Sequence, residues 1–335
     1  MRTDGPPVAD PMTAPLLEIR GLTVRYGSRL ATWAVDLTLR PGEVLGLVGE
    51  SGAGKSTVGR AVVRLLADGA RVEAGAIHFE GRDLLTLREG EMRRLRSAAI
   101  ALVPQDPLSA LNPVFRVGLQ ATDALRIHRG LGRRAAAHEM IRLLGRMGIP
   151  DAPSVMRRFP HELSGGMRQR VLIAMAFSCE PRLVIADEPT TALDATTQAQ
   201  ILRLLEELQA ERRVATLFVT HDLGVVAHLA HRVAVMYAGC LVEVAPIRAL
   251  FAAPGHPYTR GLLAQAPRAD RRTEAGALPD GLMPVLTEPP GACPFRDRCP
   301  QRLGICDAAM PPLRSVSRDH WVACHLVGDG PGDAR

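Results

Sequence analysis

The sequence predicts an α/β protein built on a parallel sheet, and three apolar segments carry this prediction. The runs Val44 to Val48 and Leu183 to Ala186 have the length and composition of buried parallel strands. The first leads into a glycine-rich loop and a helical pattern, and the second ends in two adjacent carboxylates. A third strand is predicted for Ala215 to Thr220. Open α/β sheets place their ligand chemistry beyond the carboxyl ends of such strands, so we expect the functional residues there.

The glycine-rich loop after the first strand is predicted to bind phosphate. Its sequence is that of a complete phosphate loop, Gly49-Glu50-Ser51-Gly52-Ala53-Gly54-Lys55-Ser56-Thr57. The glycines permit turns that a Cβ would resist, so that N–H groups point at an anion, and the N-terminus of a helix predicted for Ser56 to Leu66 adds positive potential. We assign Lys55 to the β- and γ-phosphates and the Ser56 hydroxyl to Mg²⁺. A glycine-rich turn without a ligand is the alternative.

The two carboxylates after the second strand, Asp187 and Glu188, are predicted to do different work. Adjacent residues of a strand face opposite ways. Asp187 would hold Mg²⁺, largely through water, and Glu188 would polarise the water that attacks the γ-phosphate. In the alternative interpretation, both acids only cap the loop after the strand.

A third motif, Leu163-Ser164-Gly165-Gly166-Met167, lies between these segments. Two glycines before a helix expose N–H donors, which makes a second phosphate cradle. One chain does not easily close two cradles on one ATP, so the motif predicts a dimer in which Ser164 and Gly166 complete the partner's site. Along the chain, the phosphate loop comes first, the Leu163-to-Met167 motif second and the acid pair third. In this order, the three motifs resemble the ATPase subunit of ATP-binding-cassette (ABC) systems over roughly residues 16 to 250. Met167 departs from the glutamine that is usual in the broader family.

The resemblance implies roles for four further residues. Tyr26 is implied to stack on adenine, and Gln105 looks like the Q-loop glutamine, which touches Mg²⁺ and couples to the membrane partner. Asp194 resembles the D-loop acid, and His221 the switch histidine that contacts the γ-phosphate. The resemblance thus implies catalysis by Glu188, Gln105 and His221, with ATP held by Tyr26, residues 49–57, Ser164, Gly165, Gly166 and Asp194. Without it, Tyr26 would be an edge-strand aromatic.

The expected domain organisation is an ABC-type P-loop ATPase domain with an inserted helical subdomain and a cysteine-rich appendage. Residues 16–250 form the ATPase domain, and about 106–170 form the helical subdomain, because helical patterns from Leu119 to Leu144 lack any strand signal. Residues 251–327 form a C-terminal extension, and residues 1–15 and 328–335 are predicted to be disordered. Within the ATPase domain, one helical face is expected to pack in the core: Ile201, Leu204, Leu205 and Leu208.

Two segments resemble the oligopeptide/dipeptide importer ATPases, a branch that also includes nickel and some sugar uptake systems. They are Gln105 to Pro113 and Gly255 to Thr259. Physically, Asn112-Pro113 is a turn signal and His256-Pro257 an extended break. Without the resemblance, neither segment would be assigned a function.

The appendage follows a stretch rich in Pro and Gly from Ala266 to Gly291 and contains four cysteines with the spacing C-x5-C-x6-C-x17-C: Cys293, Cys299, Cys306 and Cys324. Disulfides are disfavoured in a cytosolic chain, so clustered thiols suggest a metal or an iron–sulfur cluster. Four thiolates suit a [4Fe–4S] cluster or Zn²⁺ in number, and the related importers share this tail, with cluster binding described for some; we expect [4Fe–4S]. Unliganded thiols or a redox sensor are alternatives. His320 or His325 could replace one ligand, whereas Cys179 and Cys240 are expected to be small buried hydrophobes.

Composition and charge predict a cytoplasmic protein. The 335 residues are 47% hydrophobic, which supplies a core for one large domain and an appendage. No apolar run reaches transmembrane length, and the N-terminus lacks the apolar core of a signal peptide. The net charge of +6 is scattered and aromatics make up only 4%, so no nucleic-acid partner is expected. A solvated helix face or attraction to anionic lipid explains the charge.

The expected function is ATP hydrolysis that drives a peptide-type importer at the cytoplasmic face of the cell membrane. The expected partners are two transmembrane permease subunits, an extracytoplasmic substrate-binding protein and a second homologous ATPase, with a heterodimer favoured over a homodimer. The same machinery importing nickel or another small solute is an alternative. A soluble ABC ATPase acting on nucleic acid or ribosomes would usually show tandem cassettes or a long coiled-coil insertion, and neither appears in the sequence.

Overall fold

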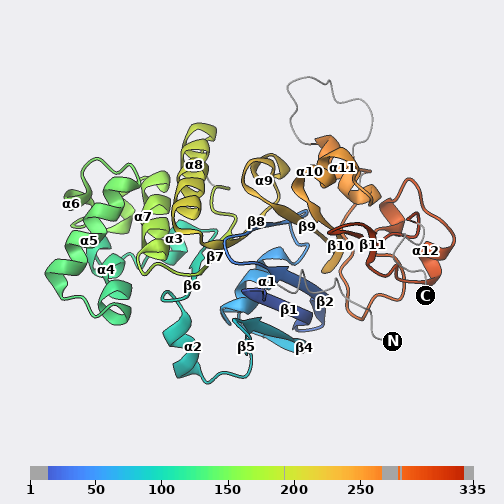
Figure 1. Ribbon diagram of the computed structural model, residues 1–335, viewed down its shortest axis with the longest axis horizontal. Coiled ribbons are helices and arrows are strands. Elements are labelled where there is room, and N and C mark those ends of the chain that lie inside the picture. The colour runs from blue at the N-terminus through green and yellow to red at the C-terminus, as the bar shows by residue number, and fades with distance from the viewer. Residues whose placement is uncertain (1–13, 192, 266–277, 280, 328–335) are drawn as a thin grey trace. The chain divides into compact units, whose positions relative to one another are not determined.

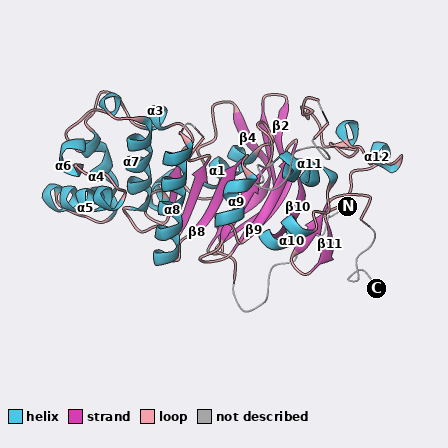
Figure 2. Ribbon diagram, turned by 90° about the horizontal axis from the view of Figure 1, so that it is seen from above, coloured by secondary structure: helices cyan, strands magenta, loops and turns pink. Residues whose placement is uncertain are grey.

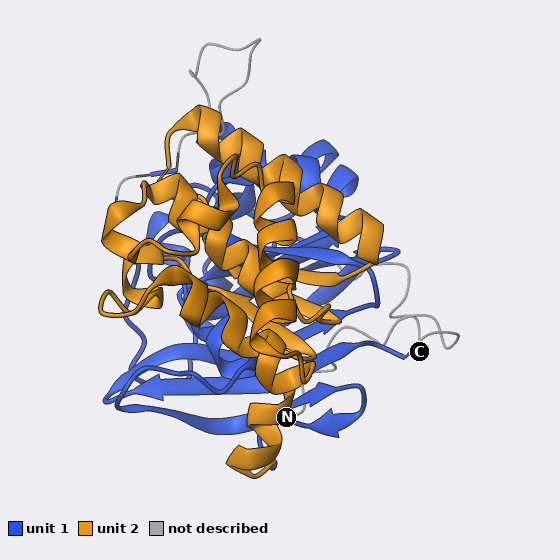
Figure 3. Ribbon diagram, turned by 90° about the vertical axis from the view of Figure 1, so that its left-hand side faces the viewer, with its two compact units in different colours: residues 1–86, 218–335 blue, residues 87–217 orange. Residues whose placement is uncertain are grey.

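The computed structural model describes residues 14–191, 193–265, 278–279 and 281–327 (Figure 1). They belong to two compact units: unit 1 contains residues 1–86 and 218–335, and unit 2 contains residues 87–217 (Figure 3). Residues 1–15 and 328–335 were predicted to be disordered. All of them except residues 14 and 15 lie outside the described residues. So does half of the Pro- and Gly-rich stretch before the cysteines.

Unit 1 contains an antiparallel sheet with the strand order β2-β1-β4-β5. Its strands are β1 (Leu17–Tyr26), β2 (Arg29–Leu39), β4 (Ala70–Phe79) and β5 (Arg82–Asp83). The four apolar side chains that precede Tyr26 in β1 are buried: Leu17, Ile19, Leu22 and Val24. Tyr26 is the last residue of the strand and pairs with Ala70 of β4.

A second sheet in unit 1, whose strands β9 and β10 are labelled in Figure 2, carries the phosphate loop at the end of β3. Within unit 1, the strands of this sheet run in the order β11-β12-β10-β9-β3. Strand β3 (Val44–Val48) is buried throughout and pairs in parallel with β9 (Arg232–Tyr237), as a buried parallel strand was predicted to do. The remaining strands are antiparallel: β10 (Cys240–Pro246), β11 (Arg314–Ser317) and β12 (His320–Val322). The last three residues of β8 (Ala215–Thr220) also belong to this unit.

The helices of unit 1 lie between its strands and within its C-terminal extension. They are α1 (Lys55–Val62), α9 (Leu223–Leu229), α10 (Ile247–Ala252), α11 (Pro257–Gln265), the 3-10 turn η2 (Arg296–Arg298) and α12 (Ile305–Ala308). The prediction of a helix from Ser56 to Leu66 was wrong at both ends. Helix α1 begins one residue earlier and stops at Val62, because Arg64 adopts a left-handed conformation with φ of 52° that ends the helical geometry.

Unit 2 pairs two parallel strands, β6 (Ile100–Val103) and β7 (Leu183–Asp187), and is otherwise largely helical. Its helices are α2 (Glu89–Leu95), α3 (Pro107–Ala110), α4 (Val117–His128), α5 (Arg133–Arg146), α6 (Ala152–Val155), η1 (Pro160–Glu162), α7 (Gly165–Phe177) and α8 (Ala195–Arg212). Helices α4 and α5 pack on α7 and lie where helical patterns were predicted. The predicted apolar face of α8 is buried.

No helix in the described part of the chain is long and apolar enough to cross a membrane.

A buried carboxylate joins the C-terminal extension to the second sheet of unit 1. Glu243 of β10 has no exposed surface, and it accepts hydrogen bonds from the backbone N–H groups of Gly255 (2.7 Å) and His256 (2.9 Å). Its Oε1 also lies 2.8 Å from Nε2 of His320 in β12. Burial by itself would raise the pKa of Glu243, but these hydrogen bonds outweigh it, and the pKa lies below the usual value. One side chain therefore connects three segments that are distant in sequence.

We expect Glu243→Gln to lower the free energy of unfolding by about 3 kcal/mol at pH 7, because the buried His320 and one N–H group lose their acceptor. The lowered pKa of Glu243 means that the stabilisation is present above the ordinary glutamate pKa and is lost as the pH falls through the folded-state value. Chemical denaturation at pH 7 and at lower pH measures both effects, and the variant should lose less stability than the wild type on acidification. The exposed Glu207→Gln serves as the control; equal effects of the two substitutions would contradict the role of Glu243.

Candidate nucleotide site

The phosphate loop takes its shape from close packing at two glycines. Gly49 and Gly54 have φ of 154° and 97°. A Cβ on Gly49 would lie 2.2 Å from the carbonyl oxygen of Met236, and one on Gly54 would lie 2.2 Å from that of Ala31. Only glycine fits both the dihedral angles and the space at these positions. The loop is thus pressed against β2 and the end of β9.

The ammonium group of Lys55 lies inside the curve of the loop. Its Nζ donates to the carbonyl oxygens of Gly49 (2.7 Å) and Glu50 (2.9 Å), and the residue is only 4% exposed. Lys55 also begins α1, whose first turn contains no acidic residue. A cation and the positive end of a helix therefore share one small region, which is an environment that favours phosphate.

The other predicted nucleotide-binding residues of unit 1 lie at strand ends. Tyr26 is half-buried at the end of β1, and His221 is exposed directly after β8. The turn at His221 is fixed by its neighbours, because the Asp222 N–H donates to the Thr220 hydroxyl (3.0 Å) and the Asp222 carboxylate accepts from the N–H of Gly224 (2.8 Å). Their roles toward a nucleotide stay predictions.

In unit 2, the acid pair at the end of β7 is almost completely buried. Asp187 is 1% and Glu188 8% exposed. Glu188 has a φ of 45°, a left-handed conformation that is uncommon for a residue with a side chain and that is often found at functional sites. Its Oε2 accepts hydrogen bonds from Nε2 of Gln105 (3.1 Å) and from the Thr191 hydroxyl (2.9 Å).

The contact between Gln105 and Glu188 joins two predicted site residues that are 83 positions apart. The parallel pairing of β6 with β7 explains it, because Gln105 follows one strand and Glu188 the other. Thr191 was not predicted. Its position three residues after Glu188 is a signal that the sequence offered, since a hydroxyl at that distance within a turn reaches back to the acid.

The glycine motif begins α7, as expected. The Ser164 hydroxyl caps the helix by accepting from the N–H of Met167 (3.3 Å), and Ser164 and Gly165 are exposed. A Cβ on Gly166 would lie 2.8 Å from Cγ2 of Thr197 in the first turn of α8. The starts of two helices therefore lie side by side within unit 2.

Asp194 caps the second of these helices. It accepts from the backbone N–H of Thr197 (2.9 Å) and from the Thr197 hydroxyl (2.8 Å). The hydrogen bond from that N–H is the main reason why the pKa of Asp194 is below its usual value. Thr197, which the sequence did not single out, thus lies between the glycine motif and the predicted D-loop acid.

The two units therefore carry different groups that nucleotide hydrolysis requires, phosphate-binding groups in unit 1 and acids in unit 2. Unit 1 supplies a glycine loop, a cation and a helix N-terminus after a parallel strand, and unit 2 supplies two buried acids at the end of another. A fold and residues of this kind define a P-loop ATPase.

Comparison with known proteins gives the family. Residues 33–191 match the ABC transporter family, and residues 242–306 match the oligopeptide/dipeptide transporter C-terminal region. The chain is 45% identical over 316 residues to the dipeptide transport ATP-binding protein DppD of Bacillus subtilis, covering 93% of this chain and 94% of that one. It is 46% identical over 313 residues to the oligopeptide transport ATP-binding protein OppD of Salmonella typhimurium, with 92% and 93% covered. This chain belongs to the ABC transporter family as an ATP-hydrolysing subunit.

The solved structures agree on the fold. The dimeric post-hydrolysis state of the ATP-binding cassette MJ0796, bound to ADP and Pi, matches with a TM-score of 0.63 and 26% identity. The match covers 69% of this chain and 99% of that cassette.

The four C-terminal cysteines lie near one another, but not as a metal site. The backbone N–H of Cys293 donates to the carbonyl of Cys306 (3.0 Å), and burial raises the pKa of the Cys293 thiol to about 11, with smaller contributions from the neighbouring cysteines. Burial also raises the pKa of Cys299 and Cys324. Across the described residues, no group of three or more Cys, His, Asp or Glu side chains is arranged to hold a metal ion. The structure therefore does not support the [4Fe–4S] or Zn²⁺ prediction.

The remaining candidates near the cysteines have other partners. His320 pairs with Glu243, and Nε2 of His325 lies 3.0 Å from the carbonyl oxygen of Ala309, so neither replaces a cysteine ligand here. Cys240 is buried, which raises the pKa of its thiol to about 12, as expected for a small hydrophobe. Cys179 is only half-buried.

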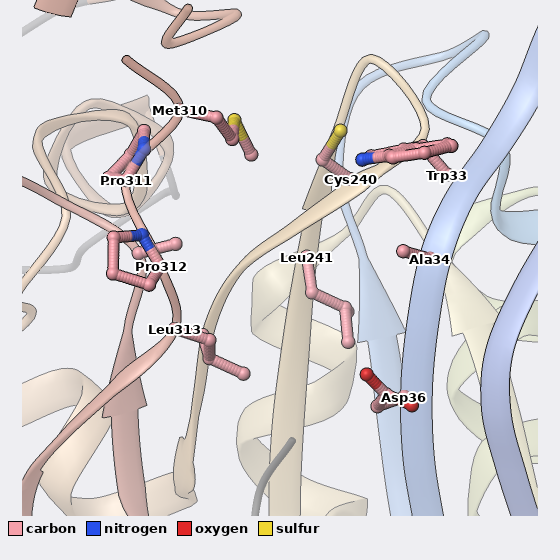
Figure 4. A pocket seen from close by; sticks show the side chains of 10 residues that line it. Trp33, Ala34, Asp36, Cys240, Leu241, Met310, Pro311, Pro312 and Leu313 are labelled. Atoms are coloured by element: carbon pink, nitrogen blue, oxygen red, sulfur yellow. The ribbon is translucent and has the colours of Figure 1, made fainter. Parts of the chain in front are cut away.

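Unit 1 also contains a pocket that the sequence did not predict (Figure 4). It is lined by Trp33, Ala34 and Asp36 of β2, Cys240 and Leu241 of β10, residues 310–313, and Ala323. None of these residues was predicted to bind ATP. Burial raises the pKa of Asp36 even though its carboxylate accepts a hydrogen bond from the N–H of Gly21.

We expect Glu188→Gln to reduce the ATP turnover rate by at least about 100-fold while ATP still binds, because the amide keeps the shape of the side chain but does not accept a proton from water. Phosphate release and ATP affinity, measured on the assembled complex, test this. Glu206→Gln, an exposed glutamate on α8, is the matched control. Near-normal turnover of Glu188→Gln would remove this residue from the catalytic role.

Proposed function

We propose that this chain is the ATP-binding subunit of an importer that takes up dipeptides and oligopeptides. The observation that carries the proposal is similarity over more than nine-tenths of the chain to relatives named as dipeptide and oligopeptide transport ATP-binding proteins. The match to the oligopeptide/dipeptide transporter C-terminal region, in a part of the chain that lies outside the ABC match, supports the same substrate class.

In this proposal, unit 1 binds the nucleotide. Residues 49–57 surround the phosphates, Lys55 neutralises the β- and γ-phosphate oxygens, Tyr26 stacks on adenine, and His221 contacts the γ-phosphate. The loop geometry, the buried ammonium group and the start of α1 support the phosphate assignment.

Unit 2 is proposed to supply the hydrolytic groups. Glu188 orients the attacking water and accepts its proton as the bond from the γ-phosphorus to the β–γ bridging oxygen breaks, which releases ADP and phosphate. The hydrogen bonds that Gln105 and Thr191 donate to its carboxylate orient this base. The Ser56 hydroxyl, the Asp187 carboxylate and the Gln105 amide oxygen are the oxygen ligands that suit Mg²⁺. When bound, Mg²⁺ neutralises charge on the phosphate oxygens.

A complete site is proposed to need two ATPase chains. Ser164 and Gly165 are exposed at the start of α7. Together with Gly166, they are assigned to the ATP held by a partner's phosphate loop, with Asp194 beside them. The similar cassette MJ0796 is described as dimeric with ADP and Pi bound, which supports this arrangement. The partner is a second homologous ATPase or a second copy of this chain.

The membrane partners are proposed to dock on the segment that follows Gln105. Four large apolar side chains are exposed there, on α3, on α4 and between them: Leu108, Val114, Phe115 and Leu119. Apolar groups gathered on a surface usually mark an interaction site. Two permease subunits would cover them and hold this chain at the cytoplasmic face of the membrane, and an extracytoplasmic binding protein would deliver the peptide. A movement of this segment would reach Glu188 through Gln105.

The test is ATP-dependent uptake of labelled peptides by vesicles that contain the complete transporter. We expect uptake with the wild type, and Ser164→Arg should abolish uptake and turnover while ATP still binds to the same chain's phosphate loop, because the arginine fills the partner's site. Ser317→Arg, on β11, is the control substitution. ATP-dependent uptake of nickel but not of peptides would overturn the substrate class. Loss of ATP from the mutated chain's own loop, with a competent partner site, would overturn the two-chain site.

We propose separately that the C-terminal cysteines take up a [4Fe–4S] cluster after rearranging. The closeness of the thiols supports this proposal, whereas their arrangement in the structure does not. The chain purified without oxygen should then contain iron and acid-labile sulfide, and Cys293→Ser should reduce both while Cys179→Ser leaves them unchanged. Stoichiometric zinc would instead indicate a structural zinc site, and a metal-free protein with titratable thiols would contradict both.

A further inference from the structure

The C-terminal extension contacts the phosphate loop at Glu50. Both terminal nitrogens of the Arg298 guanidinium donate to its carboxylate, Nη1 to Oε2 (2.8 Å) and Nη2 to Oε1 (2.9 Å). The backbone N–H of Glu50 donates to the hydroxyl oxygen of Tyr258 (2.9 Å). Its carbonyl oxygen accepts from Lys55 (2.9 Å). The side chain and both backbone polar groups of Glu50 are therefore fixed, two of the three by the extension.

Arg298 is itself held firmly in place. The residue's side chain is 10% exposed, and its Nε donates to the carbonyl oxygen of Pro279 (3.1 Å). Its guanidinium lies over the ring of Tyr237, 5.8 Å from the ring centroid. The hydrogen bonds to Glu50 are the main cause of a raised pKa for Arg298. A bidentate pair of this kind fixes direction as well as distance.

Tyr258 is fixed by aromatic packing. Its ring has no exposed surface and packs edge-on against Tyr237, with 4.7 Å between ring centroids. Phe295, which precedes Arg298 by one turn, contacts both tyrosines at 5.2 and 5.4 Å. The hydroxyl that holds the Glu50 backbone thus projects from a rigid cluster that includes the end of β9.

The extension also follows the strands beside the loop. The N–H of Leu30 donates to the carbonyl oxygen of Leu286 (2.7 Å), and Arg25 donates to that of Thr287 (2.7 Å). The turn between β9 and β10 is contacted by the sulfur of Met283, which accepts from the N–H of Ala238 (3.3 Å). The loop residue Ala53 accepts from Gly239 of this same turn (3.0 Å).

We propose that Arg298 and Tyr258 are positioning residues for ATP binding, which hold the phosphate loop in its binding conformation through Glu50. This inference rests on the proposed ATP site of unit 1. Without the two contacts, the loop spends part of its time in other conformations. The apparent ATP affinity then falls in proportion to the fraction of time that the loop spends in the binding conformation. Once ATP is bound the loop is restored, so the turnover rate at saturating ATP changes little.

The experiment compares Arg298→Met with Arg302→Met in the full-length chain assembled with its partners. Arg302 lies in the same segment but pairs with Asp307 rather than with the loop. We expect Arg298→Met to raise the dissociation constant of a non-hydrolysed ATP analogue roughly tenfold, as the loss of one charged hydrogen-bonded pair does. The turnover rate at saturating ATP should stay within about twofold of the wild-type rate. Arg302→Met should bind the analogue normally.

Two further variants separate positioning from general stability. Arg298→Lys keeps the charge but not the bidentate geometry and should restore part of the affinity. Glu50→Gln combined with Arg298→Met should bind about as weakly as the weaker single variant, because both substitutions break the same contact. Arg298→Met and Arg302→Met with equal affinity would overturn the inference, as would a lower melting temperature of Arg298→Met with unchanged affinity. A wild-type complex that did not bind the analogue would instead overturn the proposed ATP site.

Discussion

The tight packing of the phosphate loop against its neighbouring strands is the constraint on which the rest of unit 1 depends. Gly49 lies against the carbonyl of Met236 and Gly54 against that of Ala31, at distances that leave no room for a side chain. The loop therefore keeps this conformation only where it is packed against β2 and β9. In return, it directs the Lys55 ammonium inward and sets where α1 begins. The packing that shapes the loop therefore also sets the geometry of phosphate binding.

In unit 2, the packing and hydrogen bonds around Glu188 are a comparable constraint. Glu188 is buried, takes a left-handed backbone conformation, and is held by an amide and a hydroxyl from two different segments. Such a conformation persists only where the surroundings determine it. Gln105 precedes the segment that carries the exposed apolar side chains of α3 and α4, so one hydrogen bond joins this segment to the acid.

The C-terminal extension contributes rigidity to unit 1 at two points. Glu243 joins β10, the loop before α11, and β12 in the buried interior, and Glu50 joins the extension to the phosphate loop. Between them lies an aromatic cluster of Tyr237, Tyr258 and Phe295. The described part of the extension is thus held to the rest of unit 1 by specific polar contacts as well as by aromatic packing.

The sequence by itself determined the parallel strand Val44–Val48, the loop that follows it, the acid pair at the end of β7 and the helix that begins at the glycine motif. These features are local, because each depends on apolar runs, glycine spacing and capping residues within about ten positions. It misplaced the end of α1, where the left-handed Arg64 gives no sequence signal, and it placed a metal at cysteines whose arrangement does not form a site. Only the tertiary structure decided that Gln105 holds Glu188, that Gly166 lies against Thr197, and that Arg298 and Tyr258 hold Glu50. Most of these partners are far apart in the chain, and a periodic pattern within one segment carries no information about which distant segment packs against it.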